Sequence, residues 1–142
     1  MTIKKIKHYA KDIHERINYF LEVLTGEERD VSITQFNQLL QSEDIHLFLV
    51  FDQNNTILGM ITLAVNNLTT GKRAWVEDVV VDPAHQGKGL GRKMMEFIVD
   101  FAQKENADSL MLTSRASRIA ANNLYQSVGF ELRETNVYQI KF

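Results

Sequence analysis

The sequence predicts one α/β (α+β) domain over residues 1–142, in which strands and helices alternate. First, 142 residues with 44% apolar and 24% charged side chains are typical of one globular unit with its own core. Second, apolar residues recur with strand spacing in some segments and with helix spacing in others. Third, the chain has one proline and no repeat or linker-like stretch at which a second domain would begin.

The first third predicts a strand followed by two helices. Residues 2–9 have the pattern of a short strand. Asp12 with Glu15 is typical of a helix N-terminus, and Gly26 is a typical helix end. Ser32 with Gln35 predicts a capping box that opens the second helix. Each helix has one apolar face, formed by Ile13, Ile17, Phe20, Leu21 and Leu24 in the first and by Ile33, Phe36, Leu39 and Leu40 in the second.

The middle of the chain predicts three consecutive strands. Residues 45–51 and 57–66 are apolar and are separated by a hairpin turn at 52–55. Residues 66–72 predict a further turn, and residues 73–81 predict the third strand.

Beyond residue 81, helices and short strands alternate. A helix follows a glycine-rich loop and carries an apolar stripe of Leu90, Met94, Phe97, Ile98 and Phe101. A strand at 109–113, a helix at 117–127 ending near Gly129, and two final strands at 130–134 and 136–142 complete the expected element order.

Composition excludes several classes of protein. The net charge of −2 gives no general attraction to nucleic acid. No apolar run approaches 18 residues, so we expect no membrane span, and the basic N-terminal residues lack the apolar core of a signal peptide. The absence of cysteine excludes a disulfide framework and a thiol nucleophile and is compatible with a cytoplasmic location. The four histidines show no metal-ligand spacing, so we expect no metal.

The most informative segment is the apolar strand that runs into Gln86-Gly-Lys-Gly-Leu-Gly91. The glycines at 87, 89 and 91 let backbone N–H groups turn inward without a Cβ in the way. The helix that follows adds its own unpaired N–H groups and the positive end of its dipole. The segment therefore predicts a main-chain site for a pyrophosphate or a similar anion.

Two familiar phosphate loops do not fit this segment. A Walker loop ends in Gly-Lys-Ser/Thr, whereas Lys88 lies between glycines and no hydroxyl residue follows it. A dinucleotide fingerprint is Gly-x-Gly-x-x-Gly near the start of a βαβ unit, whereas these glycines are one residue closer and lie past the middle of the chain. A generic ATP- or NAD-binding domain is therefore disfavoured.

Gln86, Gly89 and Gly91 fit the pattern Gln/Arg-x-x-Gly-x-Gly/Ala, and at this point the chain resembles the GNAT superfamily of acyl-CoA-dependent N-acyltransferases. Two further segments strengthen the resemblance, Val79-Val-Val-Asp-Pro83 before the loop and Leu124-Tyr-Gln-Ser-Val-Gly-Phe130 after it. The resemblance covers residues 45–142 well and residues 1–44 loosely. It implies a mixed, mostly antiparallel sheet of about seven strands with helices on both faces.

The resemblance also implies acetyl-CoA as cosubstrate. In the family, the glycine loop binds the pyrophosphate, and main-chain groups of the preceding strand pair with the pantetheine arm. Many members have Asn seven residues before the motif tyrosine; this chain has Arg118 there, which leaves Arg118 or Asn122 as the contact. The candidate cofactor residues are Val79, Val80, Val81, Gln86, Gly87, Lys88, Gly89, Leu90, Gly91, Arg92, Arg118 and Asn122.

Two residues are candidates for catalysis. Glu77 is a carboxylate in an apolar strand, where partial burial would raise its pKa toward that of a useful base. Strand alternation places Glu77 and Asp78 on opposite faces, so we expect only one of them to point at the substrate; an exposed ion pair is the alternative for both. The resemblance assigns Tyr125 as the acid that protonates the leaving sulfur, although Tyr125 also fits a helix core stripe.

These residues predict an enzyme that acetylates a primary amine by direct attack, with a small molecule such as an amino sugar or an aminoalkyl compound as the acceptor. A protein or peptide N-terminus is the alternative acceptor, and a non-catalytic CoA-binding sensor is the alternative from another class. The apolar segment Val137–Phe142 is compatible with a homodimer.

Overall fold

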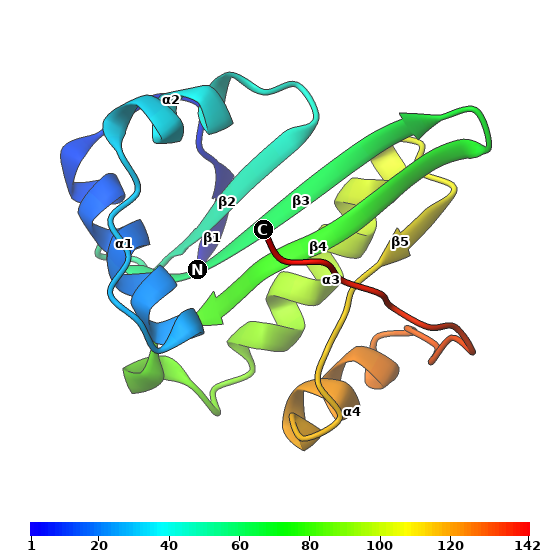
Figure 1. The fold of residues 1–142 in the computed structure, drawn as a ribbon. Helices are drawn as coiled ribbons and strands as arrows, with labels where there is room; N and C mark the ends of the chain where they lie inside the picture. The colour runs from blue at the N-terminus through cyan, green and yellow to red at the C-terminus, as the bar shows by residue number, and fades with distance from the viewer.

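The computed structural model describes all of residues 1–142 as a central sheet with helices on both sides (Figure 1). The elements in chain order are β1 (Thr2–Lys5), α1 (Lys11–Thr25), α2 (Ile33–Gln41), β2 (Ile45–Phe51), β3 (Ile57–Leu68), β4 (Gly71–Val81), a 3₁₀ turn (Pro83–His85), α3 (Leu90–Lys104), β5 (Ser109–Met111) and α4 (Ile119–Ser127). The predicted fold class, a mixed α/β domain with a mostly antiparallel sheet, is confirmed.

The five strands lie in the sheet in their chain order. β1 to β4 pair as successive antiparallel neighbours, because short turns return the chain beside itself. β5 is parallel to β4 and pairs with it only where Arg73, Ala74 and Trp75 meet Ser109, Leu110 and Met111. Beyond Trp75 the edge of β4 has no strand partner, so β4 and β5 separate toward the end at which β4 leads into the glycine loop.

The sheet separates two hydrophobic cores. On one side, Met94, Met95 and Ile98 of α3 pack with Phe48 and other sheet residues into the larger core. On the other side, α1 and α2 cover the smaller core, which contains Ile17, Phe20, Phe36, Leu49 and Met60. The apolar stripes predicted from helix spacing therefore bury opposite faces of one sheet. No helix of the chain has both the length and the apolarity needed to cross a membrane.

Local sequence signals account for one of the two N-terminal helix starts. The Ser32 side chain accepts from Gln35 N–H and the Gln35 side chain returns to Ser32 N–H, so the predicted capping box is confirmed. The predicted start at Asp12 is wrong: Ala10 is the N-cap of α1 and makes no side-chain cap. Asp12 lies in the first turn, where its negative charge favours the positive end of the helix dipole.

The largest departure from expectation is at the C-terminal end. We expected about seven strands, whereas the sheet has five, and residues 130–134 and 136–142 form none. A strand is stable only when a neighbour satisfies its backbone groups, and within this chain no ladder joins the outer edge of the three-residue β5 to residues 130–142. Several large apolar side chains of this segment consequently face solvent: Leu132, Val137, Tyr138, Ile140 and Phe142.

A β-bulge interrupts β4 opposite Ile61. Met60 pairs with Val80 and Thr62 pairs with Glu77, so two residues, Asp78 and Val79, oppose a single residue of β3. Asp78 takes a left-handed backbone conformation with φ 47°. The simple alternation expected for this strand is therefore wrong.

The bulge reverses which side chains of β4 face each core. Val76, before the bulge, packs in the larger core, and Val79 and Val81, after it, pack against that same core. Val80 turns to the smaller core. In an unbroken strand Val76 and Val80 would share a face.

Candidate active site

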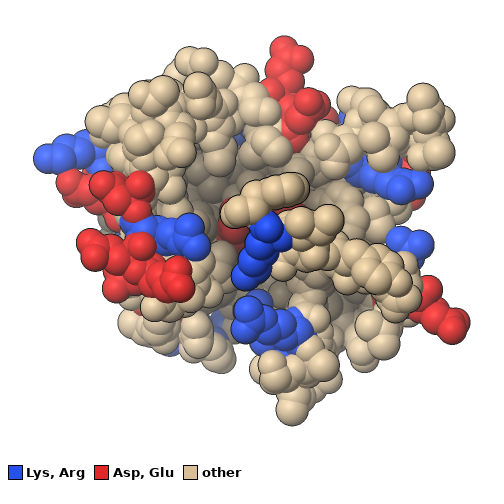
Figure 2. Space-filling model, in the orientation of Figure 1, with Lys and Arg blue, Asp and Glu red and all other residues tan.

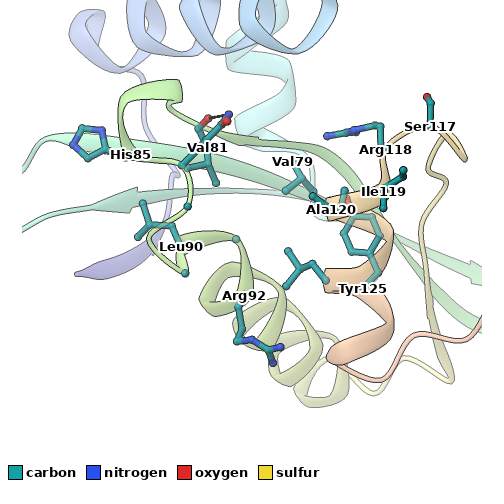
Figure 3. A pocket seen from close by; sticks show the side chains of 16 residues that line it. Val79, Val81, His85, Leu90, Arg92, Ser117, Arg118, Ile119, Ala120 and Tyr125 are labelled. Carbon is teal, nitrogen blue, oxygen red and sulfur yellow. Dashed lines mark hydrogen bonds between the residues drawn. The ribbon is translucent and has the colours of Figure 1, made fainter.

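A cavity of about 830 Å³ opens where β4 and β5 separate. Its walls are the end of β4, the glycine loop with the first turn of α3, and the N-terminal half of α4 (Figure 3). The lining residues are Val79, Val81, His85, Gln86, Gly87, Gly89, Leu90, Gly91, Arg92, Ser117, Arg118, Ile119, Ala120, Ala121, Leu124 and Tyr125. The separation of the two strands therefore provides the space, and two helix N-termini border it.

The glycine loop requires its glycines. Gly87 and Gly89 have φ of 74° and 76°, in the left-handed region that other residues enter at a cost. A Cβ at either position would meet no protein atom within 4 Å, so open space lies in front of both. Gly91 differs, because a Cβ there would come within 3.1 Å of Leu124 Cδ2. Its missing side chain lets α4 pack close to the first turn of α3.

The backbone N–H groups of residues 87–92 make no hydrogen bond to an acceptor of the chain. Gly89 is the N-cap of α3 and has no side chain to cap the helix. The positive end of the 15-residue helix dipole and a run of free N–H donors thus border the same cavity. These donors suit a multiply charged anion such as a pyrophosphate, as the sequence predicts.

Hydrogen bonds fix the chain that leads into this loop. Asp82 accepts from Ala84 N–H at 2.8 Å and thereby caps the 3₁₀ turn. The Gln86 side chain donates to Val81 O at 3.1 Å (Figure 3), and Lys88 Nζ donates to Ala84 O at 3.1 Å. Lys88 is therefore tied to the back of its own loop and does not line the cavity.

The two arginines at the cavity are placed differently. Arg118 is the N-cap of α4, and its side chain extends over the cavity (Figure 3). Arg92 points away, donating to Ser127 Oγ at 2.7 Å and lying 3.5 Å from Glu96 Oε1. Lys and Arg side chains also gather above α4 in Figure 2. An anion in the cavity would therefore meet positive charge chiefly on the α4 side.

Tyr125 lies at the inner end of the cavity. It is only 7% exposed and packs edge-on against Phe130, with ring centroids 6.2 Å apart. It also lines a second cavity of about 990 Å³ between β5 and residues 128–137. The Tyr125 ring is thus part of the larger core and also borders the cavity that the glycine loop lines. Its position is therefore compatible with a packing role and with a role as the acid.

Glu77 and Asp78 lie at the bulge rather than in the lining of the cavity. Glu77 pairs with Thr62, on the face of the sheet that α1 and α2 cover. Burial raises the pKa of the Glu77 carboxyl, and the neighbouring Asp78 carboxylate raises it further. Burial also raises the pKa of Asp78, although part of that residue is open to solvent. Glu77 and Tyr125 are therefore not brought together in one cavity; β4 lies between them.

Two other predicted cofactor residues lie outside the cavity lining. The Val80 side chain is buried in the smaller core. The Asn122 side chain donates to Arg115 O at 2.9 Å and lines the second cavity. A cofactor contact from either residue stays a prediction.

Of the wall at α4, the sequence singled out Arg118 and Tyr125 but not the small and apolar side chains around them. Those side chains gave no signal beyond helix spacing, because their exposure follows from where the helix packs. These residues are Ser117, Ile119, Ala120, Ala121 and Leu124. For metals, the structure has no group of three or more His, Asp or Glu side chains able to hold an ion; the expectation of no metal stays a prediction.

The residues that line the cavity lie within the part of the chain that matches a known family model. The model of the acetyltransferase (GNAT) family matches residues 8–130. The chain belongs to the acetyltransferase (GNAT) family. The resemblance inferred from the glycine loop and the Leu-Tyr-x-x-x-Gly-Phe segment is thereby confirmed, and acetyl-CoA is the cosubstrate that this family uses.

Curated relatives of this GNAT chain act on different acceptors. It is 34% identical to the mycothiol acetyltransferase of Renibacterium salmoninarum over 109 residues, which are 73% of this chain and 32% of the relative. It is 43% identical to the [ribosomal protein bS18]-alanine N-acetyltransferase of Escherichia coli over 53 residues, which are 37% of this chain and 36% of the relative. The chain thus matches about a third of the length of each of these relatives.

Solved structures share the fold over the whole chain. A putative acetyltransferase from Agrobacterium tumefaciens superimposes with a TM-score of 0.86 at 20% identity, covering 100% of both chains. The glucosamine-6-phosphate N-acetyltransferase from Arabidopsis thaliana gives 0.78 at 20% identity, covering 99% of both chains. At this identity the likeness shows the fold alone.

Proposed function

We propose that this GNAT chain is an N-acetyltransferase that moves an acetyl group from acetyl-CoA to a primary amine. The observation that carries the proposal is the run of free N–H donors at residues 87–92, beside a cavity that also borders the unpaired edge of β4. The donors suit the pyrophosphate, and the strand edge suits the pantetheine arm, which would pair with it as an added strand.

The residues of the chain would divide the chemistry as follows. Acetyl-CoA, when bound, supplies an acyl group activated as a thioester. Glu77 takes the proton that the amine nitrogen loses as it bonds to the acyl carbon, and its raised pKa suits a general base. Tyr125 gives a proton to the sulfur as the carbon–sulfur bond breaks. No residue is acylated, so a chain without cysteine can catalyse the transfer.

In this division Glu77 and Tyr125 act from opposite faces of the sheet, so the reacting atoms would lie at the open edge of β4, beyond Trp75, where β4 and β5 separate. The acyl group would lie at the separation of β4 and β5, with Tyr125 on the side of the larger core. The amine would approach Glu77 from the side that α1 and α2 cover. The acceptor would then contact residues of α1 and α2, which lie within residues 10–44.

We propose a small-molecule amine as the acceptor, such as an amino sugar or an aminoalkyl compound. The segments Val76-Glu-Asp-Val-Val-Val81 and Leu112-Thr-Ser114 support it, since their sequences resemble those of small-molecule members of the family. A protein or peptide N-terminus is the alternative, favoured by the match to the bS18-alanine acetyltransferase. A CoA sensor without catalytic activity is the alternative outside the enzymes.

The test follows free thiol release from acetyl-CoA in the presence of an amine panel that includes amino sugars, aminoalkyl compounds and peptides with a free N-terminus. Thiol release that depends on a small amine supports the proposal. Release that depends only on a peptide selects the alternative acceptor. CoA binding without release from any amine favours the sensor, and absence of CoA binding contradicts all three.

We also propose a homodimer, supported by the apolar side chains that residues 130–142 leave exposed. Val137, Tyr138 and Ile140 are 74%, 88% and 79% exposed. Monomeric proteins rarely leave several large apolar side chains of one segment exposed to solvent. Sedimentation equilibrium of the wild type and of Ile140→Asp tests this: we expect a dimer that the charge weakens. A cytoplasmic location likewise stays a prediction, testable by cell fractionation.

A further inference from the structure

Arg16, near the middle of α1, contacts two segments that are far from it in sequence. Its Nε and Nη2 donate to Ile57 O at 3.2 and 2.9 Å, where β3 begins. Its Nη2 also donates to the Asp82 carboxylate, at the end of β4. The guanidinium packs on the rings of Tyr19 and Phe20, 4.6 and 4.5 Å from their centroids. This is a fixed and partly desolvated position, unlike that of a surface arginine.

Asp82 joins Arg16 to the glycine loop. One carboxylate oxygen accepts from Arg16, and the other accepts from Ala84 N–H, which fixes the turn that enters the loop. Asp82 is 7% exposed, and its own N–H donates to Leu58 O at 2.9 Å. Burial alone would raise the pKa of this carboxyl, but the hydrogen bonds from Ala84 and Arg16 and the Arg16 charge hold it below its usual value.

The charge of Asp82 would oppose an anion in the loop if it stood alone. The carboxylate caps the 3₁₀ turn Pro83–His85, and the loop whose free N–H groups border the cavity, residues 87–92, begins two residues after that turn. A buried negative charge is screened by water much less than an exposed one. Arg16 neutralises it from the far side of the sheet, so the field at the loop is set by the N–H groups and the α3 dipole.

We propose that Arg16 is a positioning residue for the acyl donor, acting through Asp82: it holds the turn that presents the glycine loop and cancels the negative charge of Asp82. This inference rests on the proposed function, in that the loop receives the pyrophosphate of CoA. Arg16 itself touches neither the donor nor the reacting atoms. It connects α1, on the acceptor side of the sheet, to the donor loop.

The test measures the dissociation constant for CoA by calorimetry, on variants whose folding is checked by circular dichroism. Arg16→Met keeps an unbranched apolar stem and removes the charge and the donors; we expect it to weaken CoA binding about tenfold. The double variant Arg16→Met/Asp82→Asn removes the uncancelled charge and keeps an acceptor for Ala84 N–H. We expect it to recover most of the lost affinity, since both members of the pair are then neutral.

Arg29→Met is the matched control, because Arg29 pairs only with Glu27 at an exposed site. Binding within twofold of wild type for Arg16→Met, or equally weak binding for the double variant, overturns the proposal. A role confined to stability would leave the affinity of each folded variant unchanged. If Arg16→Met does not fold, Arg16→Lys and Asp82→Asn replace it. Lys keeps the charge without the fork, and we expect it to bind CoA more weakly than wild type, whereas Asp82→Asn, which has no negative charge to cancel, should bind CoA at least as tightly as wild type. Failure of the wild type to bind CoA would instead contradict the proposed function.

Discussion

At the scale of single residues, the Asp78 carboxylate at the β4 bulge influences the neighbouring Glu77. Burial is the larger cause of the raised pKa of Glu77, and the charge of Asp78 adds to it. Folding thus favours the neutral form of Glu77 relative to the unfolded chain, and the carboxyl loses its proton at a higher pH than an ordinary glutamate does. A base with a raised pKa binds the amine proton more strongly, which is what general base catalysis requires.

We therefore predict that Glu77→Gln lowers kcat/KM for acetyl transfer by about 10²- to 10⁴-fold. Asp78→Asn removes the neighbouring charge, so the pKa of Glu77 falls and the rising limb of the pH profile moves to lower pH. The comparison with wild type isolates this shift from the titration of the amine, which is common to both. Retained activity in Glu77→Gln together with loss in Asp78→Asn would assign the base to Asp78 instead.

Tyr125 can be tested by separating its hydroxyl from its ring. Tyr125→Phe keeps the packing against Phe130 and removes only the group that would protonate the sulfur. We predict a kcat lowered about 10²-fold with nearly unchanged thermal stability. Tyr125→Ala, the packing control, should lose about 3–5 kcal/mol of unfolding free energy, because the ring is part of the larger core. Full activity in Tyr125→Phe would leave Tyr125 with a packing role alone.

At the scale of elements, local chemistry decided what could be predicted. Ser32 and Gln35 satisfy each other within one turn, so their capping box was predictable from spacing. The β4 bulge was not, because it depends on the register with β3, which no local pattern specifies. The last two strands were expected from their apolar residues. A strand also needs a neighbouring strand to pair with, and residues 130–142 pair with no other strand of this chain.

The glycine loop offers an element-scale prediction with an internal control. Gly89 and Gly26 have nearly equal φ, 76° and 75°, and a Cβ at either meets nothing within 4 Å. Each of the variants Gly89→Ala and Gly26→Ala should therefore lose about 1–2 kcal/mol of unfolding free energy, because alanine is strained in this left-handed backbone conformation. Only Gly89→Ala should also weaken acetyl-CoA binding, because only Gly89 borders the cavity. Equal CoA affinity in both variants, measured by calorimetry, would contradict the role of the loop.

At the scale of the whole molecule, the site depends on contacts that lie far apart in sequence. The sequence predicted the cavity walls made by β4 and the glycine loop, because consecutive residues carry that chemistry. Of the α4 wall it predicted only Arg118 and Tyr125, and it did not predict the link between Arg16 and Asp82, which are 66 positions apart. Such pairs follow from the packing of α1 beside the end of β4, so only the assembled fold brings them together.

The two cores share one sheet, and this predicts that residues 1–142 unfold as a single domain. Each strand from β2 to β4 contributes to both cores, so neither core can be lost without the other. Calorimetry should show one transition. Acetyl-CoA at 100 times its dissociation constant should stabilise the protein by about 2.7 kcal/mol. This corresponds to a rise in Tm on the order of 10 °C. ATP and NAD at the same concentration should raise the Tm less. Two separate transitions would contradict the single domain, and an equal response to NAD would contradict a loop selective for CoA.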